Sequence, residues 1–191
     1  MKNDIILSGV GGQGILSIAA IIGLGAVENN LFIKQAEVHG MSQRGGDVQS
    51  HFRLSDNEIS SDLIPQGKAD LILSVEPMES LRYLPWLSRN GWLVTNSNPF
   101  VNIPGYPEVD ELLAEIKKIK NSIIVDADTI ARNLGSVKVA NTVMLGVASH
   151  FIEVPYSSLE NAIRTLFGRK GDEIVELNLQ ALNAGFLEVK G

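Results

Sequence analysis

The chain has 191 residues, of which 45% are hydrophobic and 20% charged, and its formal net charge is -6. This length fits one domain with a substantial core, and the acidic balance argues against a nucleic-acid partner, whose phosphates require a basic face. Cysteine is absent, which excludes disulfides, thiolate nucleophiles and cysteine-ligated zinc or iron–sulfur clusters within the chain.

A membrane location is not expected either. The longest apolar stretch, residues 14–27, is too short to span a bilayer and contains Ser17 and three glycines. No cluster of lysine and arginine accompanies an amphipathic stripe, and no secretory signal is visible. We therefore expect a cytoplasmic protein.

The chain opens with a βαβ pattern. Residues 4–8 form a short apolar strand that ends at glycines, apolar residues then recur at helical spacing from Ile15 to Ala26, and residues 31–36 resemble a second strand. The helix is apolar nearly all round, because Leu16, Ile21 and Leu24 widen its apolar face. Such a helix is expected to lie buried between the sheet and a neighbouring element.

An antiparallel hairpin is predicted next. Residues 48–54 alternate as a strand does, and Asp56-Asn57 forms a turn before residues 58–63. The two segments are too close in sequence for a helical crossover, so they are expected to pair with each other.

The alternation of strands and helices then resumes. Strands are predicted at residues 69–75, 91–96 and 122–125, and helices near 77–83, 109–119, 128–134, 140–151, 158–167 and 172–187. The predicted fold class is α/β, a three-layer α/β/α sandwich with a Rossmann-like, mainly parallel sheet and the hairpin as an insertion. The ligand or partner surface should lie at the carboxyl ends of the strands, beside Gln13, Glu76, Asn96 and Asp126.

The first glycine-rich segment comprises Gly9, Gly11, Gly12, Gln13 and Gly14 and follows G-x-G-x-x-G between a strand and a helix. Such a turn lets the backbone and a helix N-terminus approach an anion. Three interpretations stay open: a dinucleotide site, glycines that merely let helix and strand pack closely, or a phosphate or protein partner at the same loop. For a dinucleotide site the acidic ribose ligand could only be Glu37, which lies later than the usual spacing.

The second segment comprises Ser42, Gln43, Arg44, Gly45 and Gly46. Glycines around one arginine let a guanidinium and backbone N–H groups reach an anion together. The alternative is a solvated, mobile loop.

No set of residues has the spacing of a catalytic triad, so no catalytic residue is assigned. His39 and His51 lack a third ligand nearby, so no metal site is assigned. Asp126 and Asp128 fit helix capping best. Asn141 interrupts an apolar helix and could hydrogen-bond a loop or a partner.

These segments, in this order, resemble the gamma subunit or gamma domain of the 2-oxoacid:ferredoxin oxidoreductases, and most of all the small (beta) subunit of the indolepyruvate type. The resemblance also rests on Arg53, on residues 69–73 leading to Glu76-Pro77, and on residues 140–146. It is clear from residue 5 to about residue 147. It implies that residues 1–191 form a single pyruvate/ketoisovalerate oxidoreductase gamma-type domain.

The resemblance implies a subunit of a heteromeric enzyme that oxidatively decarboxylates a 2-oxoacid with coenzyme A, forms an acyl-CoA and passes electrons to ferredoxin. Thiamine diphosphate, magnesium and iron–sulfur clusters should belong to a large partner subunit, since this chain has no cysteine and no Gly-Asp-Gly segment followed by paired asparagines. The chain alone should be inactive and should shape the catalytic assembly. The candidate cofactor-binding residues, which contact either coenzyme A or the partner subunit, are Gly9, Gly11, Gly12, Gln13, Gly14, Ser42, Arg44, Gly45, Gly46 and Asn141.

Two other functions remain open at this point. One is a stand-alone NAD(P)-binding Rossmann oxidoreductase, although the chain leaves little room for a second substrate-binding region. The other is an interaction protein with vestigial glycines.

Overall fold

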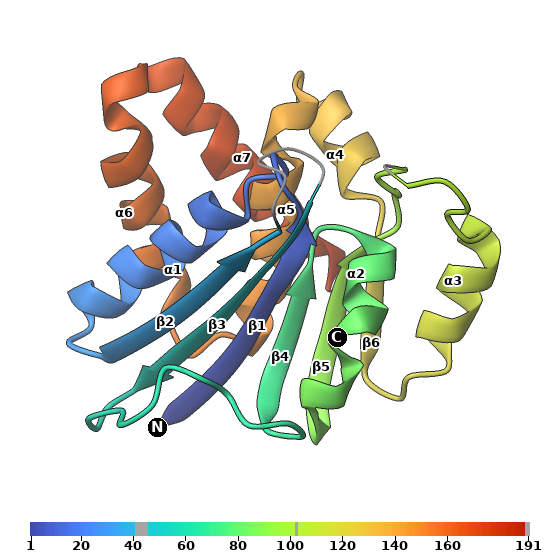
Figure 1. The fold of residues 1–191 in the computed structure, drawn as a ribbon. Coiled ribbons are helices and arrows are strands. Elements are labelled where there is room, and N and C mark those ends of the chain that lie inside the picture. Colours follow the sequence, from blue (N-terminus) through green and yellow to red (C-terminus); the bar gives the residue numbers. More distant parts are fainter. Residues whose placement is uncertain (41–45, 102, 190–191) are drawn as a thin grey trace.

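The computed structural model describes residues 1–40, 46–101 and 103–189, without the side chain of His39. Strands and helices alternate along most of the chain, as the sequence predicts (Figure 1). The strands are β1 (Lys2–Val10), β2 (Phe32–His39), β3 (Asp47–Ser55), β4 (Ala69–Ser74), β5 (Leu87–Asn96) and β6 (Ser122–Val125). The α-helices are α1 (Ile15–Glu28), α2 (Pro77–Arg82), α3 (Val109–Lys117), α4 (Ala127–Asn133), α5 (Ala140–Ala148), α6 (Tyr156–Phe167) and α7 (Asp172–Glu188). Short 3-10 helices are η1 (Leu84–Trp86), η2 (Val137–Val139), η3 (Ser149–Phe151) and η4 (Gly168–Lys170).

The six strands form one sheet in the order β2-β3-β1-β4-β5-β6. The pairs β1–β4, β4–β5 and β5–β6 are parallel, whereas β3 runs antiparallel to both of its neighbours, β1 and β2. The α/β fold with a mainly parallel sheet is therefore confirmed.

The predicted hairpin is wrong in its second strand. Residues 48–54 do lie in an antiparallel strand, β3, but its hairpin partner is the preceding strand β2, and residues 58–63 form no strand. The guanidinium of Arg53 holds that segment instead, because its Nη1 donates to the carbonyl oxygens of Ser61 and Leu63 at 3.0 and 3.1 Å. The same guanidinium pairs with the buried carboxylate of Asp4.

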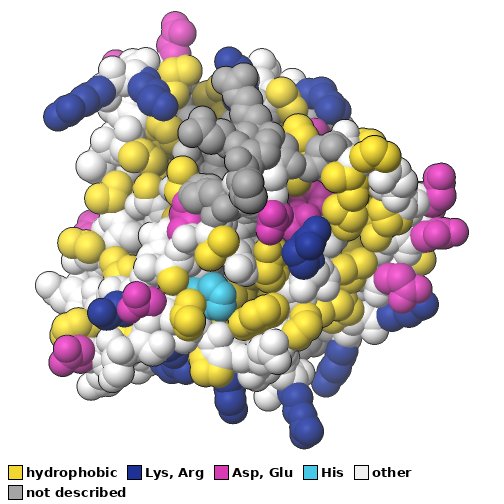
Figure 2. Space-filling model, viewed as in Figure 1, with side chains coloured by type: hydrophobic (Ala, Val, Ile, Leu, Met, Phe, Trp, Pro, Cys, Tyr) yellow, Lys and Arg dark blue, Asp and Glu magenta, His cyan; other side chains and the backbone are white. Residues whose placement is uncertain are grey.

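Helices cover both faces of the sheet (Figure 1). The larger core unites one face with α1, α4, α5, α6 and α7, and the smaller core unites the other face with α2, η1 and α3. The central strand β1 shows the alternation: Ile5 and Leu7 enter the larger core, and Ile6 enters the smaller one. Hydrophobic side chains also lie in patches over the outer surface on the α2 side (Figure 2).

Helices α5 and α7 meet backbone to backbone. A Cβ built on Gly185 would lie 1.9 Å from the carbonyl oxygen of Val143, and one built on Gly146 would lie 2.1 Å from that of Leu182. Glycine is required at both positions because any side chain would separate the helices. This contact places α7, and with it Asn178, whose amide oxygen accepts a hydrogen bond from Thr142 on α5.

We expect Gly185→Ala to lower the free energy of unfolding by about 3 kcal/mol, because the added methyl forces two packed helices apart. The matched control is Gly168→Ala, where a Cβ meets no atom within 4 Å and the backbone is already right-handed helical. The control should be neutral or slightly stabilising. Urea unfolding of both variants measures the difference, and equal losses would refute the role assigned to the helix contact.

His51 lies on the smaller-core face of β3 and is buried. Its Nδ1 accepts a hydrogen bond from the backbone N–H of Ile64 at 3.0 Å, and its ring meets Trp86 edge to face. Burial, and secondarily the charge of Arg53, lower the pKa of His51. The neutral imidazole therefore belongs to the folded state.

Because the pKa of His51 is lower in the folded than in the unfolded chain, its contribution to stability is complete above the unfolded value, about 6.5, and declines as the pH falls below it. We expect the unfolding free energy of the native chain to decrease between pH 7 and pH 5. His51→Asn keeps an acceptor for Ile64 but does not titrate, so its stability should change less over this interval. Chemical unfolding at pH 5, 6 and 7 provides the test, and identical pH slopes would contradict it.

Candidate functional site

The strand order places a topological switch point between β1 and β4. From β1 the chain continues into α1, in the larger core, whereas from β4 it continues into α2, on the opposite face of the sheet. Ligands of open α/β sheets bind at such points, beyond the carboxyl ends of the strands. The first glycine segment, residues 9–14, lies at this place.

The glycine turn needs residues without a side chain. Gly12 has φ 102° and Gly14 has φ 83°, a left-handed conformation that other residues rarely adopt. Gly9 is packed, since a Cβ there would lie 2.4 Å from Cγ2 of Val75. Gly12 is open, because a Cβ there would meet no atom within 4 Å.

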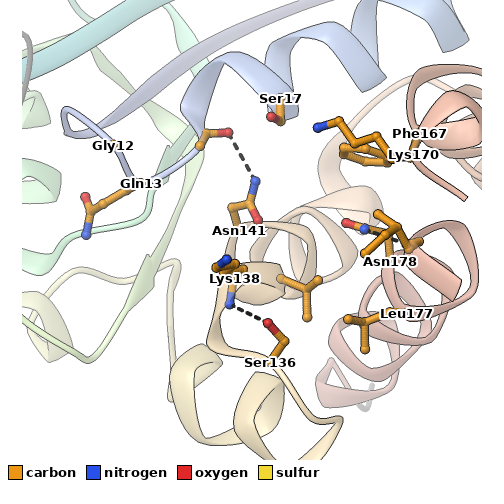
Figure 3. A pocket seen from close by; sticks show the side chains of 13 residues that line it. Gly12, Gln13, Ser17, Ser136, Lys138, Asn141, Phe167, Lys170, Leu177 and Asn178 are labelled. Atoms are coloured by element: carbon orange, nitrogen blue, oxygen red, sulfur yellow. Dashed lines mark hydrogen bonds between the residues drawn. The ribbon is translucent and has the colours of Figure 1, made fainter.

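Two amide side chains brace the turn. Oε1 of Gln13 accepts from the N–H of Val10 at 2.7 Å, and its Nε2 donates to the carbonyl oxygen of Val75 at 3.4 Å. Nδ2 of Asn141, at the start of α5, donates to the carbonyl oxygen of Gly14 at 3.2 Å. Figure 3 shows Gln13 turned away from Asn141. Both predicted residues therefore lie at the turn, where they hold its shape.

The turn presents backbone donors. The amides of Gly12, Gly14 and Ile15 donate no hydrogen bond to any residue that the structure describes. Unpaired N–H groups at the start of a helix, together with the helix dipole, favour an anion. The turn therefore has the donor set of an anion site.

Of three grooves that border the turn, two share Gly12, Gln13, Lys138 and Asn141. The first, here called the lysine groove, has a volume of about 370 Å³ and lies between the turn and the α6–α7 junction (Figure 3). Its further lining includes Gly14, Phe167, Lys170 and Leu177. The second, here called the strand-end groove, has a volume of about 290 Å³ and reaches Val75, Asn96, Phe100 and Asp128.

The two glycine segments meet. The N–H of Gly11 donates to the carbonyl oxygen of Gly46 at 2.8 Å, just beyond the last β1–β3 pair, Val10 opposite Asp47. The predicted site residues Ser42, Arg44 and Gly45 lie outside the described residues. Of the ten predicted residues, the seven others fall at the turn or against it, and their role in binding stays a prediction.

A buried carboxylate fixes the loop after β5. Oε1 of Glu76 accepts hydrogen bonds from the hydroxyl of Tyr106 and the N–H of Phe100, and Oε2 accepts from the N–H of Glu79 at the start of α2. Burial, and next the hydrogen bond to Glu76, raise the pKa of Tyr106, so its hydroxyl stays protonated as a donor. Glu76 thus sets the position of Phe100, a wall of the strand-end groove.

Asparagines fix the neighbouring strand ends. Asn96 accepts from the N–H of Ala127 and donates to Asp128 at 3.0 Å, and Asn98 donates to Asp126 at 2.6 Å. Asp126 caps α4 by accepting from the N–H of Thr129, which is the main cause of its lowered pKa. The interpretation of both residues as acidic groups at a helix N-terminus is confirmed, since Asp126 caps α4 and Asp128 lies in its first turn. Asp128 also lines the strand-end groove.

Glu37 does not occupy the position of a ribose ligand. It lies on the edge strand β2, which β3 separates from β1, and its carboxylate accepts from Gln35 at 3.1 Å. Two strand spacings amount to about 10 Å, whereas the Rossmann fingerprint needs the acidic residue on the strand next to the glycine turn. The geometry disfavours a dinucleotide site of that type.

Sequence reasoning missed Lys138, Phe167, Lys170 and Tyr106. The sequence carries a signal for Lys138, because this residue lies only three positions before Asn141. It carries none for Phe167 and Lys170, because their approach to the turn depends on how α7 packs against α5.

Two further features, metal sites and membrane-spanning helices, were sought in the residues that the structure describes. No group of three or more His, Asp or Glu side chains among the described residues could hold a metal ion. No helix in the same residues combines the length and apolarity needed to cross a bilayer.

The sequence model of the pyruvate ferredoxin/flavodoxin oxidoreductase family matches residues 4–188, so the chain belongs to this family. It is 37% identical to the indolepyruvate oxidoreductase subunit IorB of Archaeoglobus fulgidus, over 97% of this chain and 94% of that protein. It is 34% identical to the subunit of the same name from Methanothermobacter thermautotrophicus, over 97% of each chain.

Solved structures share the fold. The pyruvate oxidoreductase subunit PORC of Thermotoga maritima superposes with a TM-score of 0.75 at 23% identity, over 99% of this chain and 97% of that one. The 2-oxoglutarate:ferredoxin oxidoreductase of Magnetococcus marinus, solved with 2-oxoglutarate, coenzyme A and succinyl-CoA bound, gives 0.76 at 19% identity, over 97% of this chain and 30% of that one.

Removing the Tyr106 hydroxyl tests the anchoring of the loop. We expect Tyr106→Phe to lower the free energy of unfolding by about 2 kcal/mol, the typical contribution of a hydrogen bond to a charged group. The matched control is Tyr156→Phe, because the Tyr156 hydroxyl is buried without a hydrogen-bond partner. That change should be neutral or stabilising. Equal effects in urea unfolding would show that Tyr106 does not anchor the loop.

Proposed function

We propose that this chain is the small subunit of a heteromeric 2-oxoacid oxidoreductase, of the indolepyruvate type, working in the cytoplasm. The assembly would oxidatively decarboxylate an arylpyruvate with coenzyme A, giving an acyl-CoA and carbon dioxide and passing two electrons to ferredoxin. The observation that carries the proposal is near-full-length similarity to two IorB subunits, at 37% and 34% identity.

The redox and decarboxylation chemistry is assigned to a large partner subunit. Iron–sulfur clusters need thiolate ligands, and this chain has no cysteine. The sequence also lacks the Gly-Asp-Gly segment typical of thiamine diphosphate and magnesium binding. We assign thiamine diphosphate, magnesium and the clusters to the partner, and to this chain, as one gamma-type domain, the shaping of the cleft.

Coenzyme A is the group that this chain's own residues suit. Its phosphates need donors and positive charge, which the unpaired amides of Gly12 and Gly14 and the ammonium group of Lys138 supply beside the glycine turn. We propose that residues 9–14 and 42–46 contact coenzyme A, with Asn141 holding the turn in shape. Bound there, coenzyme A supplies the thiol that accepts the acyl group.

The exposed surface of α1 supports the proposal that a partner subunit packs against this chain. This helix carries no charged residue before Glu28, and it leaves Leu16, Leu24 and Val27 exposed, although it packs against the sheet and α6. A helix that is apolar on all sides is normally covered on all sides. The predicted position of α1 between the sheet and a neighbouring helix is confirmed, but its predicted burial is wrong at Leu16 and Leu24, which are exposed. We propose that the large subunit covers this stripe.

A stand-alone NAD(P)-dependent enzyme has less support. The acidic residue expected at the ribose lies on the edge strand, two strands from the glycine turn. The vestigial-glycine interpretation explains neither the unpaired amides nor the two grooves beside them.

The proposal is tested with the chain alone and with its large partner subunit. Reduction of a viologen dye is measured with indolepyruvate, phenylpyruvate, pyruvate or 2-oxoglutarate, each with coenzyme A. We expect no turnover by the chain alone, and turnover by the complex that is fastest with an arylpyruvate. Turnover by the chain alone would overturn the division of labour.

A calorimetric control addresses the competing function. NADH and NADPH should bind the chain no more tightly than the millimolar range, roughly -4 kcal/mol. A micromolar dissociation constant would favour the dehydrogenase.

A further inference from the structure

The two edges of the sheet differ in length. The edge strand β6 has four residues, whereas β2 at the other edge has eight. Short edge strands, prolines and bulges are the devices by which proteins prevent an edge from pairing with another chain. β2 contains no proline, and all of its residues pair with β3 in one unbroken register. Among the described residues, no strand pairs with its outer side (Figure 1).

Half of the backbone groups of β2 point away from β3. The N–H of Gly40 donates to the carbonyl oxygen of Asp47 at 2.8 Å, one position beyond the end of the β2–β3 ladder. Because hydrogen-bonded pairs alternate along an antiparallel ladder, the backbone groups of the even-numbered residues of β2 face β3. Those of Ile33 and Gln35 therefore face outward, where a further strand would pair with them.

The exposed apolar side chains of β2 lie symmetrically about Gln35. Phe32 is 49% exposed and Val38 is 53% exposed, and they lie three positions before and three positions after Gln35. Both project from the same face of the sheet as Lys34, whose ammonium group lies 3.7 Å from the carboxylate of Asp62. Apolar side chains exposed on an uncovered edge strand favour contact with another chain.

A second copy of β2 fits this edge in the antiparallel orientation. A two-fold axis at Gln35 places the two Gln35 residues opposite each other, and it places each Phe32 opposite the Val38 of the other copy. Residues that lie opposite each other share a face of the sheet, so an aromatic ring meets a β-branched side chain twice. Such cross-strand pairs stabilise sheets.

Charge selects this register among the two-fold alternatives. An axis at Lys34 or at Glu37 would place two like charges directly opposite each other, which destabilises a strand pair. An axis at Ala36 avoids this repulsion but leaves Phe32 without a residue of β2 opposite it. In the register described above, each Lys34 lies opposite the uncharged Ala36.

The size of the contact predicts its strength. Eight residues at about 3.4 Å each give an edge about 27 Å long, and a band about 10 Å wide along it covers roughly 300 Å² on each copy. Total areas below about 1,200 Å² belong to weak or transient contacts. Such a contact becomes effective when a further subunit holds the two copies close, because tethering raises their effective concentration.

We propose that two copies of this chain pair through their β2 strands about a two-fold axis at Gln35, so that their two sheets join into one. Ile33 packs on the larger core together with α1, so Phe32 and Val38 lie on the opposite face and the contact does not use α1. The inference is independent of the proposed function. In an assembly with a large subunit it implies that two small subunits are present.

Disulfide trapping tests the register, because the native chain has no cysteine. In this register the two Gln35 Cα atoms lie about 5.5 Å apart, within the span of a disulfide, whereas the two Ala36 Cα atoms lie about 8 Å apart. We expect Gln35→Cys to form a disulfide-linked dimer under mild oxidation, both as the free chain and in complex with the large subunit. Ala36→Cys, and Gln180→Cys on the exposed side of α7, should form little.

A proline tests the backbone pairing and leaves the β2–β3 ladder intact. Gln35→Pro removes an N–H that points away from β3, a position at which edge strands accept proline. Gln35→Ala is the matched control, because it loses the same side-chain hydrogen bonds to Ser50 and Glu37 but keeps the N–H. In sedimentation equilibrium we expect Gln35→Pro to raise the dimer dissociation constant about tenfold and Gln35→Ala to leave it unchanged. Thermal melting checks that both variants fold.

Three results would overturn the proposal. The first is the absence of a Gln35→Cys cross-link in both the free chain and the complex. The second is more efficient cross-linking of Ala36→Cys, and the third is an equal dissociation constant for Gln35→Pro and Gln35→Ala. If the large subunit protects the β2 amides from hydrogen exchange while no cross-link forms, the edge belongs to a strand of that subunit. None of these results bears on the proposed function, which the turnover assay tests separately.

Discussion

Nine consecutive residue pairs between β1 and β3 hold the two glycine segments together. The register runs from Lys2 opposite Ser55 to Val10 opposite Asp47, and the next residues, Gly11 and Gly46, share a backbone hydrogen bond. A slip of one residue would turn every side chain of β3 to the other face and would separate this contact. The position of β3 also moves β2 to the sheet edge. One pairing thus both builds the candidate site and removes the geometry of a dinucleotide site.

Local order could be predicted from the sequence, because it depends on neighbours along the chain. The run from β1 through the glycine turn into α1 follows from an apolar strand, residues that tolerate positive φ, and apolar residues at helical spacing. The partner of β3 could not be predicted. Residues 32–39 and 58–63 are both close in sequence, and the choice between them depends on Arg53, which reaches back to Asp4 and binds the carbonyl oxygens of Ser61 and Leu63.

The site was predictable in part for the same reason. Gln13 stood out as a polar residue in the glycine segment at a strand end, and Asn141 as a polar residue in an apolar helix. Both contact the glycine turn, but only tertiary structure shows that they brace its backbone. The lysine groove requires α6 and α7 to approach α1 and α5. That approach depends on Gly146 and Gly185, whose contact brings together residues nearly forty positions apart. No sequence period reports such a contact.

The exposed stripe of α1 has a consequence for how the protein is made. Leu16, Leu24 and Val27 lie in solvent in the free chain, so copies made in excess of the proposed partner would expose an apolar stripe that contains no charged residue. Such copies would associate with one another or be removed by proteases. Synthesis in step with the proposed large subunit would keep the stripe covered if that subunit packs on α1.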